Sequence, residues 1–321
     1  MRQTINLTEA GLDSTVRLAE VKLDGSDTGS ECGPEYGPEC IKGNVIICPG
    51  GAYRWHSPRE ALPVAKAFAA QGWKPWILYY KVSVHGEVLG TAPLCQAAAA
   101  VRKVRAASPG RPVILCGFSA GGHVAASLGV HWNDEHLFAG EDCSVIRPDG
   151  LILGYPVITA GKYAHRESME MLAGPDPAAV DPAAADPAAA EGDSAGPDSV
   201  AAEGNSAGSY SAAAEGDSAG PGYYSLEKYV DAQTPPAFIW HTAGDSTVAV
   251  QNSLCFAESL AAKGVPFELH IYPYGEHGLS LATREVEEAE KQRYADPHVA
   301  GWFDQCAQWL DLVFLHPHAS A

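Results

Sequence analysis

The chain has 321 residues, a formal net charge of −18, and 46% hydrophobic residues. This length predicts one large domain or two small ones, and the apolar content is ample for a core. Lys and Arg residues form no cluster, which argues against a nucleic-acid partner, and the lack of about 18 consecutive apolar residues argues against a membrane span.

The N-terminus and the cysteines bear on the cellular compartment. Residues 1–7 contain no apolar core of signal-peptide length, so we expect a cytoplasmic protein. Five cysteines fall in apolar segments and are expected to be buried free thiols: Cys48, Cys95, Cys116, Cys255 and Cys306. Cys32 and Cys40 share a Gly/Pro-rich loop that fits no zinc pattern, so we expect no metal there, and whether they pair stays open.

The predicted elements alternate between strands and helices. Residues 13–24 alternate apolar and polar side chains, which predicts a half-exposed antiparallel strand at a sheet edge. Apolar runs predict buried strands over 44–49, 74–80, 113–116, 150–156, 237–241 and 266–272. Helices are predicted over 59–71 and 94–107, from Ala120 onward, over 165–172 and 249–263, and along a final stripe from Trp302 to Val313. This order predicts a mostly parallel sheet with helices on both faces and an active site at the carboxyl ends of the strands.

Residues 174–222 differ from the rest of the chain. Asp-Pro-Ala-Ala recurs from positions 176, 181 and 186, and Ala-Glu-Gly-(Asp/Asn)-Ser-Ala-Gly recurs from 190, 202 and 214. The segment has almost no large apolar side chains, so burial cannot offset the entropy lost on ordering. We therefore predict one domain over 1–321 that carries a low-complexity, disordered insertion at 174–222.

Ser119 has the sequence context of a catalytic nucleophile. It lies in Gly117-Phe118-Ser119-Ala120-Gly121, directly after a predicted buried strand and before small helix-forming residues. This is the pattern of a nucleophile elbow, in which a side chain at either glycine would collide where strand and helix nearly touch. Ser194, Ser206 and Ser218 also lie in Gly-x-Ser-x-Gly, but none of them follows an apolar strand, so we do not expect them to be catalytic.

A serine nucleophile needs a base, and a carboxylate must orient that base. In this fold the expected chain order is Ser, then Asp or Glu, then His. Asp245 follows the predicted strand 237–241 and His277 follows 266–272, so both should reach the sheet edge that carries Ser119. The rivals are weaker: His270 lies mid-strand, His241 closely precedes Asp245, His123 suits packing in the nucleophile helix, and Glu276 should point away from its neighbour His277.

An oxyanion hole needs two backbone donors aimed at the developing charge. The N–H of Ala120 is one, and the loop after strand 44–49 should supply the other, from Gly51 or Ala52. Tyr53, Trp55 and His56 follow this loop and are candidates for stacking on a sugar, with ordinary loop packing as the open alternative.

Five blocks of sequence together resemble a known family. They are Pro49-Gly50-Gly51-Ala52-Tyr53, Arg59-Glu60, Gly117 to His123, Thr234 to Thr242 and Val265 to Pro273. Their order and spacing, over nearly the whole chain outside 174–222, resemble α/β-hydrolases of the bacterial acetyl-xylan-esterase-like carbohydrate esterase group. The resemblance implies removal of acetyl or other short acyl groups from sugars, without a cofactor, by Ser119, Asp245 and His277.

Two positions depart from the pattern of this group, and one region should form a cap. Pro49-Gly50-Gly51-Ala52 stands where related esterases often carry His-Gly-Gly-Gly, which should narrow the pocket without removing its backbone donors. No second acid precedes Asp245 in its loop. Because such enzymes often place cap elements where 157–230 lies, residues 165–172 and 223–230 are expected to border the pocket.

The sequence thus predicts a single-domain α/β-hydrolase that is a serine esterase with a small acylated substrate, most simply an acetylated sugar. A serine peptidase or amidase of the same fold is the alternative within enzymes. A peptidase of this type would need a propeller or a large cap to bind peptide. A catalytically silent binding module is the alternative outside enzymes, and the intact Ser, His and Asp set argues against it.

Overall fold

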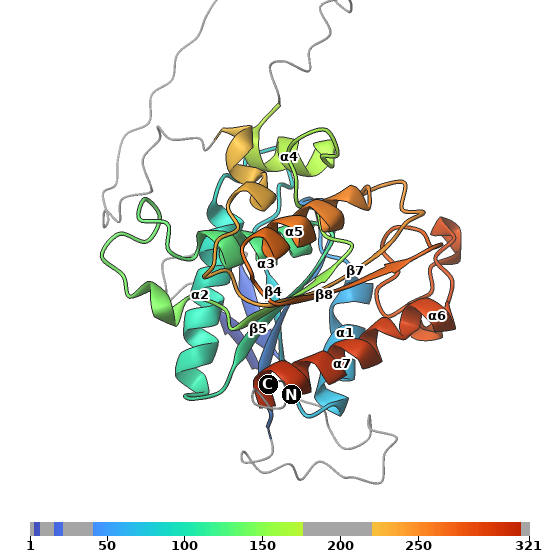
Figure 1. Cartoon of the computed structure of the whole chain (residues 1–321), viewed down its shortest axis with the longest axis horizontal. Coiled ribbons are helices and arrows are strands. Elements are labelled where there is room, and N and C mark those ends of the chain that lie inside the picture. The colour runs from blue at the N-terminus through green and yellow to red at the C-terminus, as the bar shows by residue number, and fades with distance from the viewer. Residues whose placement is uncertain (1–2, 7–15, 22–40, 176–219, 316–321) are drawn as a thin grey trace, which may run out of the picture.

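A computed structural model describes residues 3–6, 16–21, 41–175 and 220–315 of the chain (Figure 1). The insertion predicted at 174–222 lies outside these residues except at its two ends, and so does the loop that carries Cys32 and Cys40.

Eight strands form one sheet in the order β1-β2-β4-β3-β5-β6-β7-β8. The strands are β1 (Gln3–Asn6), β2 (Arg17–Glu20), β3 (Asn44–Cys48), β4 (Lys74–Tyr79), β5 (Val113–Phe118), β6 (Gly150–Gly154), β7 (Ala237–Thr242) and β8 (Phe267–Tyr272). β1 and β2 pair antiparallel, and β2 pairs antiparallel with β4, whereas the strands from β4 to β8 pair parallel. The prediction of a mostly parallel sheet is therefore confirmed.

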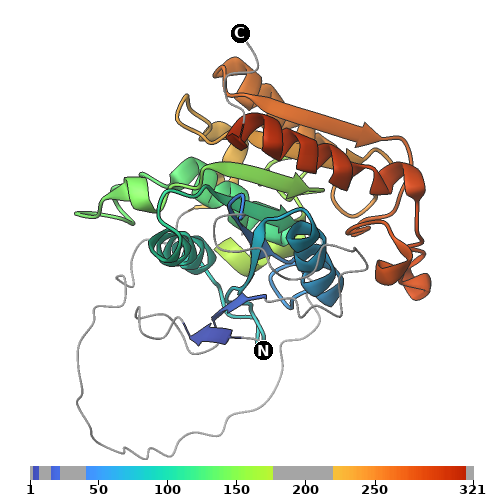
Figure 2. The ribbon, with the colours of Figure 1, turned by 90° about the horizontal axis from the view of Figure 1, so that it is seen from below.

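One edge of the sheet is formed by a strand other than the one expected from the sequence. The strand predicted over 13–24 is β2, and it is antiparallel as expected, but β1 pairs with its outer side, so β2 is not the edge. β1 has only four residues, too few to show a periodic pattern. Figure 2 shows β1 and β2 (dark blue) at one end of the sheet and β8 (orange) at the other.

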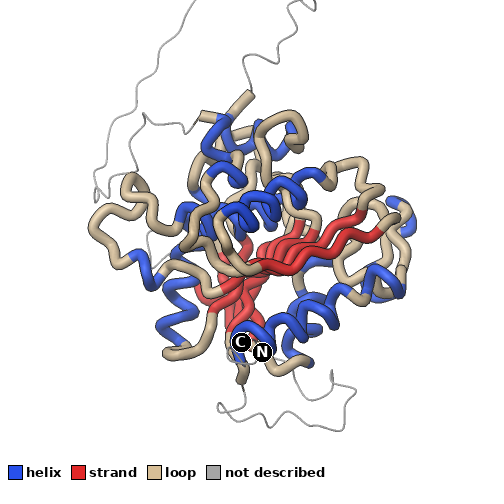
Figure 3. The backbone as a smooth tube through the Cα atoms, in the orientation of Figure 1, coloured by secondary structure: helices blue, strands red, loops and turns tan. Residues whose placement is uncertain are grey.

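Helices cover both faces of the sheet (Figure 3). One face packs against α2 (Ala92–Ala107), α3 (Ala120–His131) and α5 (Gln251–Ala262), and the other packs against α1 (Leu62–Ala70) and α7 (Trp302–Leu310). The remaining α-helices are α4 (Arg166–Ala173) and α6 (Pro297–Ala300). Short 3-10 helices are η3 (Pro58–Glu60), η4 (Cys143–Val145), η5 (Pro221–Tyr224), η6 (Leu226–Lys228), η7 (Arg284–Val286) and η8 (Ala289–Lys291), and a π-helical turn, η9 (Asp311–Leu315), follows α7.

The two-sided cover explains why the central strands are apolar along their whole length. Every residue of β3, β5, β6 and β7 is buried, as expected for parallel strands with a helix layer above and below. β8, at the sheet end, is only partly buried. The stripe predicted for the last helix packs on the sheet through Trp302, Cys306, Trp309 and Leu310, all buried. Among the described helices, none has both the length and the hydropathy needed to cross a bilayer.

Parallel pairing sets the position of the site. β3, β5, β6, β7 and β8 run in one direction, so the loops that follow them leave the sheet at the same edge. These loops carry the candidate oxyanion residues, Ser119, Asp245 and His277, which come from four separate parts of the sequence.

Candidate active site

Ser119 sits at a strained corner between β5 and α3. Its backbone has φ 52° and ψ −121°, a conformation that residues other than glycine seldom adopt. The flanking glycines make the corner possible, because a Cβ at Gly117 would lie 2.1 Å from the carbonyl oxygen of Gly121. A Cβ at Gly121 would lie 2.0 Å from the carbonyl oxygen of Cys48 on β3. The local geometry is the one that the Gly-x-Ser-x-Gly pattern predicts.

Three side chains meet at the edge of the sheet. The Oγ atom of Ser119 lies 2.8 Å from Nε2 of His277, and Nδ1 of His277 lies 2.6 Å from Oδ2 of Asp245. Because the carboxylate can only accept, Nδ1 carries the imidazole proton, and Nε2 is left to accept from the Ser119 hydroxyl. The structure thus brings together the three residues that the loop positions predict.

Asp245 is held in its ionised form by its surroundings. Burial opposes the charge, but hydrogen bonds from the imidazoles of His241 and His277, and from the backbone N–H of Val248, outweigh it and hold the pKa of Asp245 well below its usual value. Its Oδ1 atom accepts from the N–H groups of Thr247 and Val248, each at 2.9 Å. The carboxylate is therefore fixed in place as well as charged.

His241, a rival for the catalytic base on the sequence, contacts the Asp245 carboxylate and not Ser119. It is completely buried, its Nε2 atom lies 3.3 Å from Oδ2 of Asp245, and Nε2 also lies 3.0 Å from the carbonyl oxygen of Val248. Both neighbours are acceptors, so Nε2 carries the proton, and Nδ1 accepts from the Ser253 hydroxyl at 2.8 Å. Its spacing of four residues from Asp245 was the one signal available, and it does not reveal the direction of either side chain.

The loop after β3 adopts an unusual backbone at three successive residues. Gly51, Ala52 and Tyr53 have φ of 134°, 52° and 62°. The carbonyl of Gly51 points into the loop, where it accepts from the N–H groups of Arg54 and Trp55. Within the described part of the chain, the N–H groups of Ala52 and Ala120 donate to no partner. Two candidate oxyanion donors thus remain available.

A cavity of about 130 Å³ lies beside Ser119. Its lining includes Gly51, Ala52, Trp55, His165, His277 and Arg293. His165 caps α4, with Nδ1 accepting from the N–H of Ser168, and burial lowers the pKa of His165. The prediction that 165–172 borders the pocket is met by His165 and Glu167, whereas 223–230 contributes none of its lining residues.

Tyr53 does not line this cavity, so its prediction as a substrate-binding residue is wrong. The side chain is 1% exposed, and its hydroxyl lies 2.8 Å from Nδ1 of His123. The positive φ of Tyr53 turns the side chain into the core, where its ring packs edge-on against Tyr80. Trp55, by contrast, stays 46% exposed at the cavity, with the ammonium group of Lys291 over its ring.

The other rival residues, His123, His270 and Glu276, lie elsewhere. His123 is buried, lies 3.0 Å through Nε2 from the carbonyl oxygen of Tyr224, and burial lowers its pKa to about 4. His270 lies 2.7 Å from the Glu268 carboxylate on β8. Glu276 is exposed. None of these three side chains contacts the Ser119 hydroxyl among the described hydrogen bonds.

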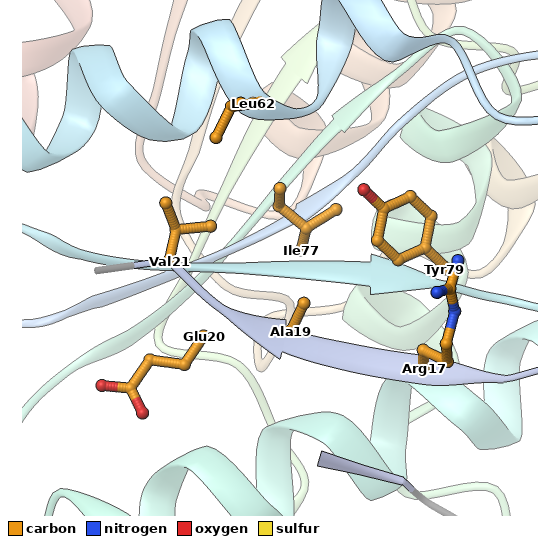
Figure 4. A pocket seen from close by; sticks show the side chains of 7 residues that line it. All are labelled: Arg17, Ala19, Glu20, Val21, Leu62, Ile77 and Tyr79. Atoms are coloured by element: carbon orange, nitrogen blue, oxygen red, sulfur yellow. The ribbon is translucent and has the colours of Figure 1, made fainter. Parts of the chain in front are cut away.

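A second cavity, of about 120 Å³, shares no lining residue with the first (Figure 4). It is lined by Arg17, Ala19, Glu20, Val21, Leu62, Ile77 and Tyr79, a set with no serine, cysteine or histidine. Within the described ranges, no group of three or more His, Cys, Asp or Glu residues is arranged to hold a metal ion.

Sequence comparison places the chain among hydrolases. Residues 215–308, which carry Asp245 and His277, match the prolyl oligopeptidase family. Over 248 residues, 75% of its length, the chain is 33% identical to the endo-1,4-β-xylanase B of Butyrivibrio fibrisolvens. It spans about a third of the length of that curated relative.

Solved structures match the chain over nearly its whole length. The acetyl ester-xyloside bifunctional hydrolase of Caldicellulosiruptor lactoaceticus matches with a TM-score of 0.62 and 30% identity, over 92% of this chain and 87% of that one. A sugar hydrolase of Lactococcus lactis matches with a TM-score of 0.61 and 27% identity, over 97% of both chains. A carboxylesterase of Lactobacillus plantarum, 23% identical over 97% of this chain and 96% of that one, shares the fold with a TM-score of 0.68.

Proposed function

This chain belongs to the α/β-hydrolases, in the acetyl-xylan-esterase-like group of serine ester hydrolases, and we propose that it removes acetyl or other short acyl groups from carbohydrates through Ser119, His277 and Asp245. The single observation that carries the proposal is the unbroken chain of contacts from Oγ of Ser119 through His277 to Asp245, at 2.8 and 2.6 Å. An imidazole so placed can act as the base that takes the proton of the serine hydroxyl.

The proposed reaction runs in two halves. Ser119 Oγ attacks the ester carbonyl while Nε2 of His277 takes the hydroxyl proton, and Asp245 stabilises the resulting imidazolium. The N–H groups of Ala120 and of Gly51 or Ala52 hold the negative oxygen of the tetrahedral intermediate. Its collapse breaks the bond to the leaving alcohol, which takes the proton from His277. A water molecule then attacks the acyl-enzyme by the same route and releases the carboxylic acid.

The cavity supports a small acyl group on a polar alcohol. Its volume of about 130 Å³ is small, and its lining is rich in polar side chains such as His165, Glu167 and Arg293. An exposed indole, Trp55, stands at the same site, where a sugar ring could stack on it. The reaction as proposed uses no cofactor.

Serine peptidase or amidase activity is the second candidate, because residues 215–308 match the prolyl oligopeptidase family. A catalytically silent binding module is the third, and the hydrogen-bonded Ser, His and Asp set argues against it. Kinetics separate the three. We expect turnover of p-nitrophenyl acetate and of acetylated xylo-oligosaccharides, and little turnover of aminoacyl or dipeptidyl nitroanilides.

The matched control is Ser119→Ala, which should lower kcat by about 10⁴-fold or more because it removes the nucleophile. Faster turnover of the nitroanilides than of the acetyl esters would favour the peptidase. Unchanged ester turnover in Ser119→Ala would refute the proposed nucleophile. Sugar binding without any turnover by the unaltered protein would favour the binding module.

A further inference from the structure

Glu60 is a buried carboxylate beside the active site that the proposed reaction does not use. It is 3% exposed and sits at the end of η3. Its Oε2 atom accepts from the N–H of Gly50 at 2.8 Å, and Oε1 accepts from the hydroxyl of Tyr155 at 2.7 Å. Gly50 directly precedes the candidate oxyanion residues Gly51 and Ala52, so the carboxylate holds the base of that loop.

Tyr155 carries this connection to the histidine. Its hydroxyl donates to Glu60 and accepts from the N–H of Ser280 at 2.9 Å. The ring of Tyr155 also packs edge-on against the ring of His277, with centroids 5.0 Å apart. The atoms from Gly50 through Glu60 and Tyr155 to Ser280 thus form one continuous path between the oxyanion loop and the loop that presents His277.

The neighbouring residue, Arg59, holds the same histidine loop from the other side. Its Nη1 atom donates to the carbonyl of Gly278 at 2.7 Å, and Nε donates to the carbonyl of Val286 at 2.6 Å. Its own carbonyl accepts from the hydroxyl of Ser280 at 2.7 Å. Two adjacent residues therefore contact both loops that must be aligned with Ser119.

Both loops contain backbone that would relax without external support. Ala52 and Tyr53 have positive φ on the oxyanion side, and Ser280 and Ala282 have φ of 55° and 52° on the histidine side. Such conformations are costly for residues other than glycine, and they persist only where surrounding contacts over-determine them. Neither loop belongs to a helix or strand. Backbone hydrogen bonds, such as Ser57 N–H to Gly50 and Ala282 N–H to Leu279, hold part of each loop, and side-chain contacts add to that support.

We propose that Arg59 and Glu60 are a positioning unit. It holds the oxyanion loop (Gly50 to Tyr53) and the histidine loop (His277 to Ala282) in the correct place relative to Ser119. Neither residue forms or breaks a bond in the reaction. The unit acts through Gly50 on one side and through Gly278 and Ser280 on the other. The inference rests on the ester hydrolysis proposed above, because the placement of these loops relative to Ser119 affects activity only if they serve catalysis.

Glu60→Gln is the first test, because glutamine keeps the size of the side chain but offers one acceptor oxygen to two donors. We expect kcat for p-nitrophenyl acetate to fall about 10- to 100-fold, less than the loss of a whole oxyanion donor, with KM within about 3-fold. A change confined to KM would overturn the proposal, because it would mean that Glu60, which lines the cavity, contacts the substrate instead.

Tyr155→Phe and Arg59→Gln test the other links. Each should lower kcat about 10-fold, because each frees one side of the histidine loop. In the double variant Glu60→Gln/Tyr155→Phe, the fold-loss in kcat should be smaller than the product of the two single fold-losses and close to that of Glu60→Gln alone. The reason is that the two residues share one hydrogen bond. Full multiplication of the two effects would contradict the shared path.

The chain offers a matched control for each charge. Glu227 is partly buried and accepts from Thr159 and Ser225 hydroxyls, and Arg105 donates to two backbone carbonyls, those of Val145 and Arg147. Glu227→Gln and Arg105→Gln should lower stability by amounts similar to the test variants while leaving kcat within about 2-fold. An equal fall of kcat in test and control variants would reduce the unit to a general structural role and overturn the proposal.

Amide hydrogen exchange gives a readout that does not depend on activity. In Glu60→Gln, exchange should quicken in 49–57 and 278–282, and in Tyr155→Phe it should quicken only in 278–282. If the unaltered protein hydrolyses esters, but Glu60→Gln and Tyr155→Phe change neither exchange nor kcat, the positioning role would be refuted and the proposed function would not. If exchange changes as expected but esterase activity survives Ser119→Ala, the support of the two loops by Glu60 would stand. The proposed function, and with it a catalytic reason for that support, would be refuted.

Discussion

His241 and His277 bracket the carboxylate of Asp245, one imidazole on each side of the same oxygen, Oδ2. The distances to that oxygen are 3.3 Å from Nε2 of His241 and 2.6 Å from Nδ1 of His277. The second imidazole faces Ser119, whereas the first is completely buried and contacts Ser253 and Val248. Asp245 is therefore held by a second, buried imidazole as well as by the one that faces Ser119.

Replacing His241 tests this anchor. His241→Leu removes the N–H donor to Asp245, so we expect kcat to fall about 10-fold and stability to drop by about 1–3 kcal/mol, because the Ser253 hydroxyl and the Val248 carbonyl lose their partner. His241→Gln places an amide N–H near the same position and should recover most of kcat. Steady-state kinetics with p-nitrophenyl acetate and urea titration measure both. Wild-type kcat in His241→Leu would show that the backbone donors to Asp245 suffice.

The pH dependence of stability should report on buried His123. Burial lowers the pKa of His123 from 6.5 to about 4, so the folded state binds fewer protons than the unfolded state between these values. The stability that neutral His123 provides is complete above pH 6.5 and is lost as the pH falls toward 4, by up to about 3 kcal/mol. The free energy of unfolding from urea titrations at pH 7.5, 6, 5 and 4.5 should fall accordingly.

A variant isolates that contribution. His123→Gln removes the ionisable group, so its stability should be lower than that of the wild type at pH 7.5 and should fall less steeply below pH 6.5. His56, whose pKa burial also lowers to about 4, adds a parallel slope that remains in the variant. Identical slopes in the wild type and His123→Gln would contradict the burial of a neutral imidazole at this position.

The elbow glycines should not tolerate a methyl group. In Gly121→Ala the new Cβ would lie 2.0 Å from the carbonyl oxygen of Cys48, a backbone atom of a central strand that cannot move aside. We expect a loss of at least about 3 kcal/mol in unfolding free energy and of nearly all esterase activity. Gly222→Ala is the control, because its Cβ would meet nothing within 4 Å, and it should keep both stability and kcat.

Trp55 and Tyr53 should respond in opposite ways to substitution. Trp55→Ala should raise KM for acetylated xylo-oligosaccharides about 5- to 20-fold, since stacking of a sugar ring on an indole contributes on the order of 1–2 kcal/mol. KM for p-nitrophenyl acetate, which carries no sugar, should change little.

Tyr53→Phe should do the reverse, with unchanged KM for both substrates and a stability loss of about 1–3 kcal/mol, because it leaves the buried His123 Nδ1 without the Tyr53 hydroxyl. A higher KM for the oligosaccharide in Tyr53→Phe, at unchanged stability, would reopen a substrate role for Tyr53. An oligosaccharide KM unaffected by Trp55→Ala would remove the aromatic contact from the proposed sugar site.

The sequence was most informative where composition and periodicity act directly. The six parallel strands follow from their apolar runs, because two helix layers demand apolar residues on both faces. The turn around Ser119 follows from steric need at Gly117 and Gly121. Asp245 and His277 follow from the expected order of serine, acid and histidine together with their position after parallel strands, which end at one edge. These features need no knowledge of which way a side chain points.

The parts that the sequence did not predict depend on side-chain direction. Tyr53 follows the oxyanion loop as a substrate-binding residue would, but its φ of 62° directs it into the core. His241 and Glu60 read as charged or polar residues at element ends, and only the folded chain shows that each is buried against an active-site neighbour. β1 was not predicted because a strand of four residues is too short to show an alternating hydrophobic pattern.

The long sequence separation within the active site has a consequence for refolding. Ser119 and His277 are 158 residues apart, and β6 and β7 lie between the strands that precede them. Their contact requires β8 to have docked, so it depends on pairings that are non-local and intrinsically slow. Recovery of ester turnover after dilution from denaturant should therefore lag the return of the helical circular dichroism signal. The time course of ester turnover would then report when β8 docks onto the sheet.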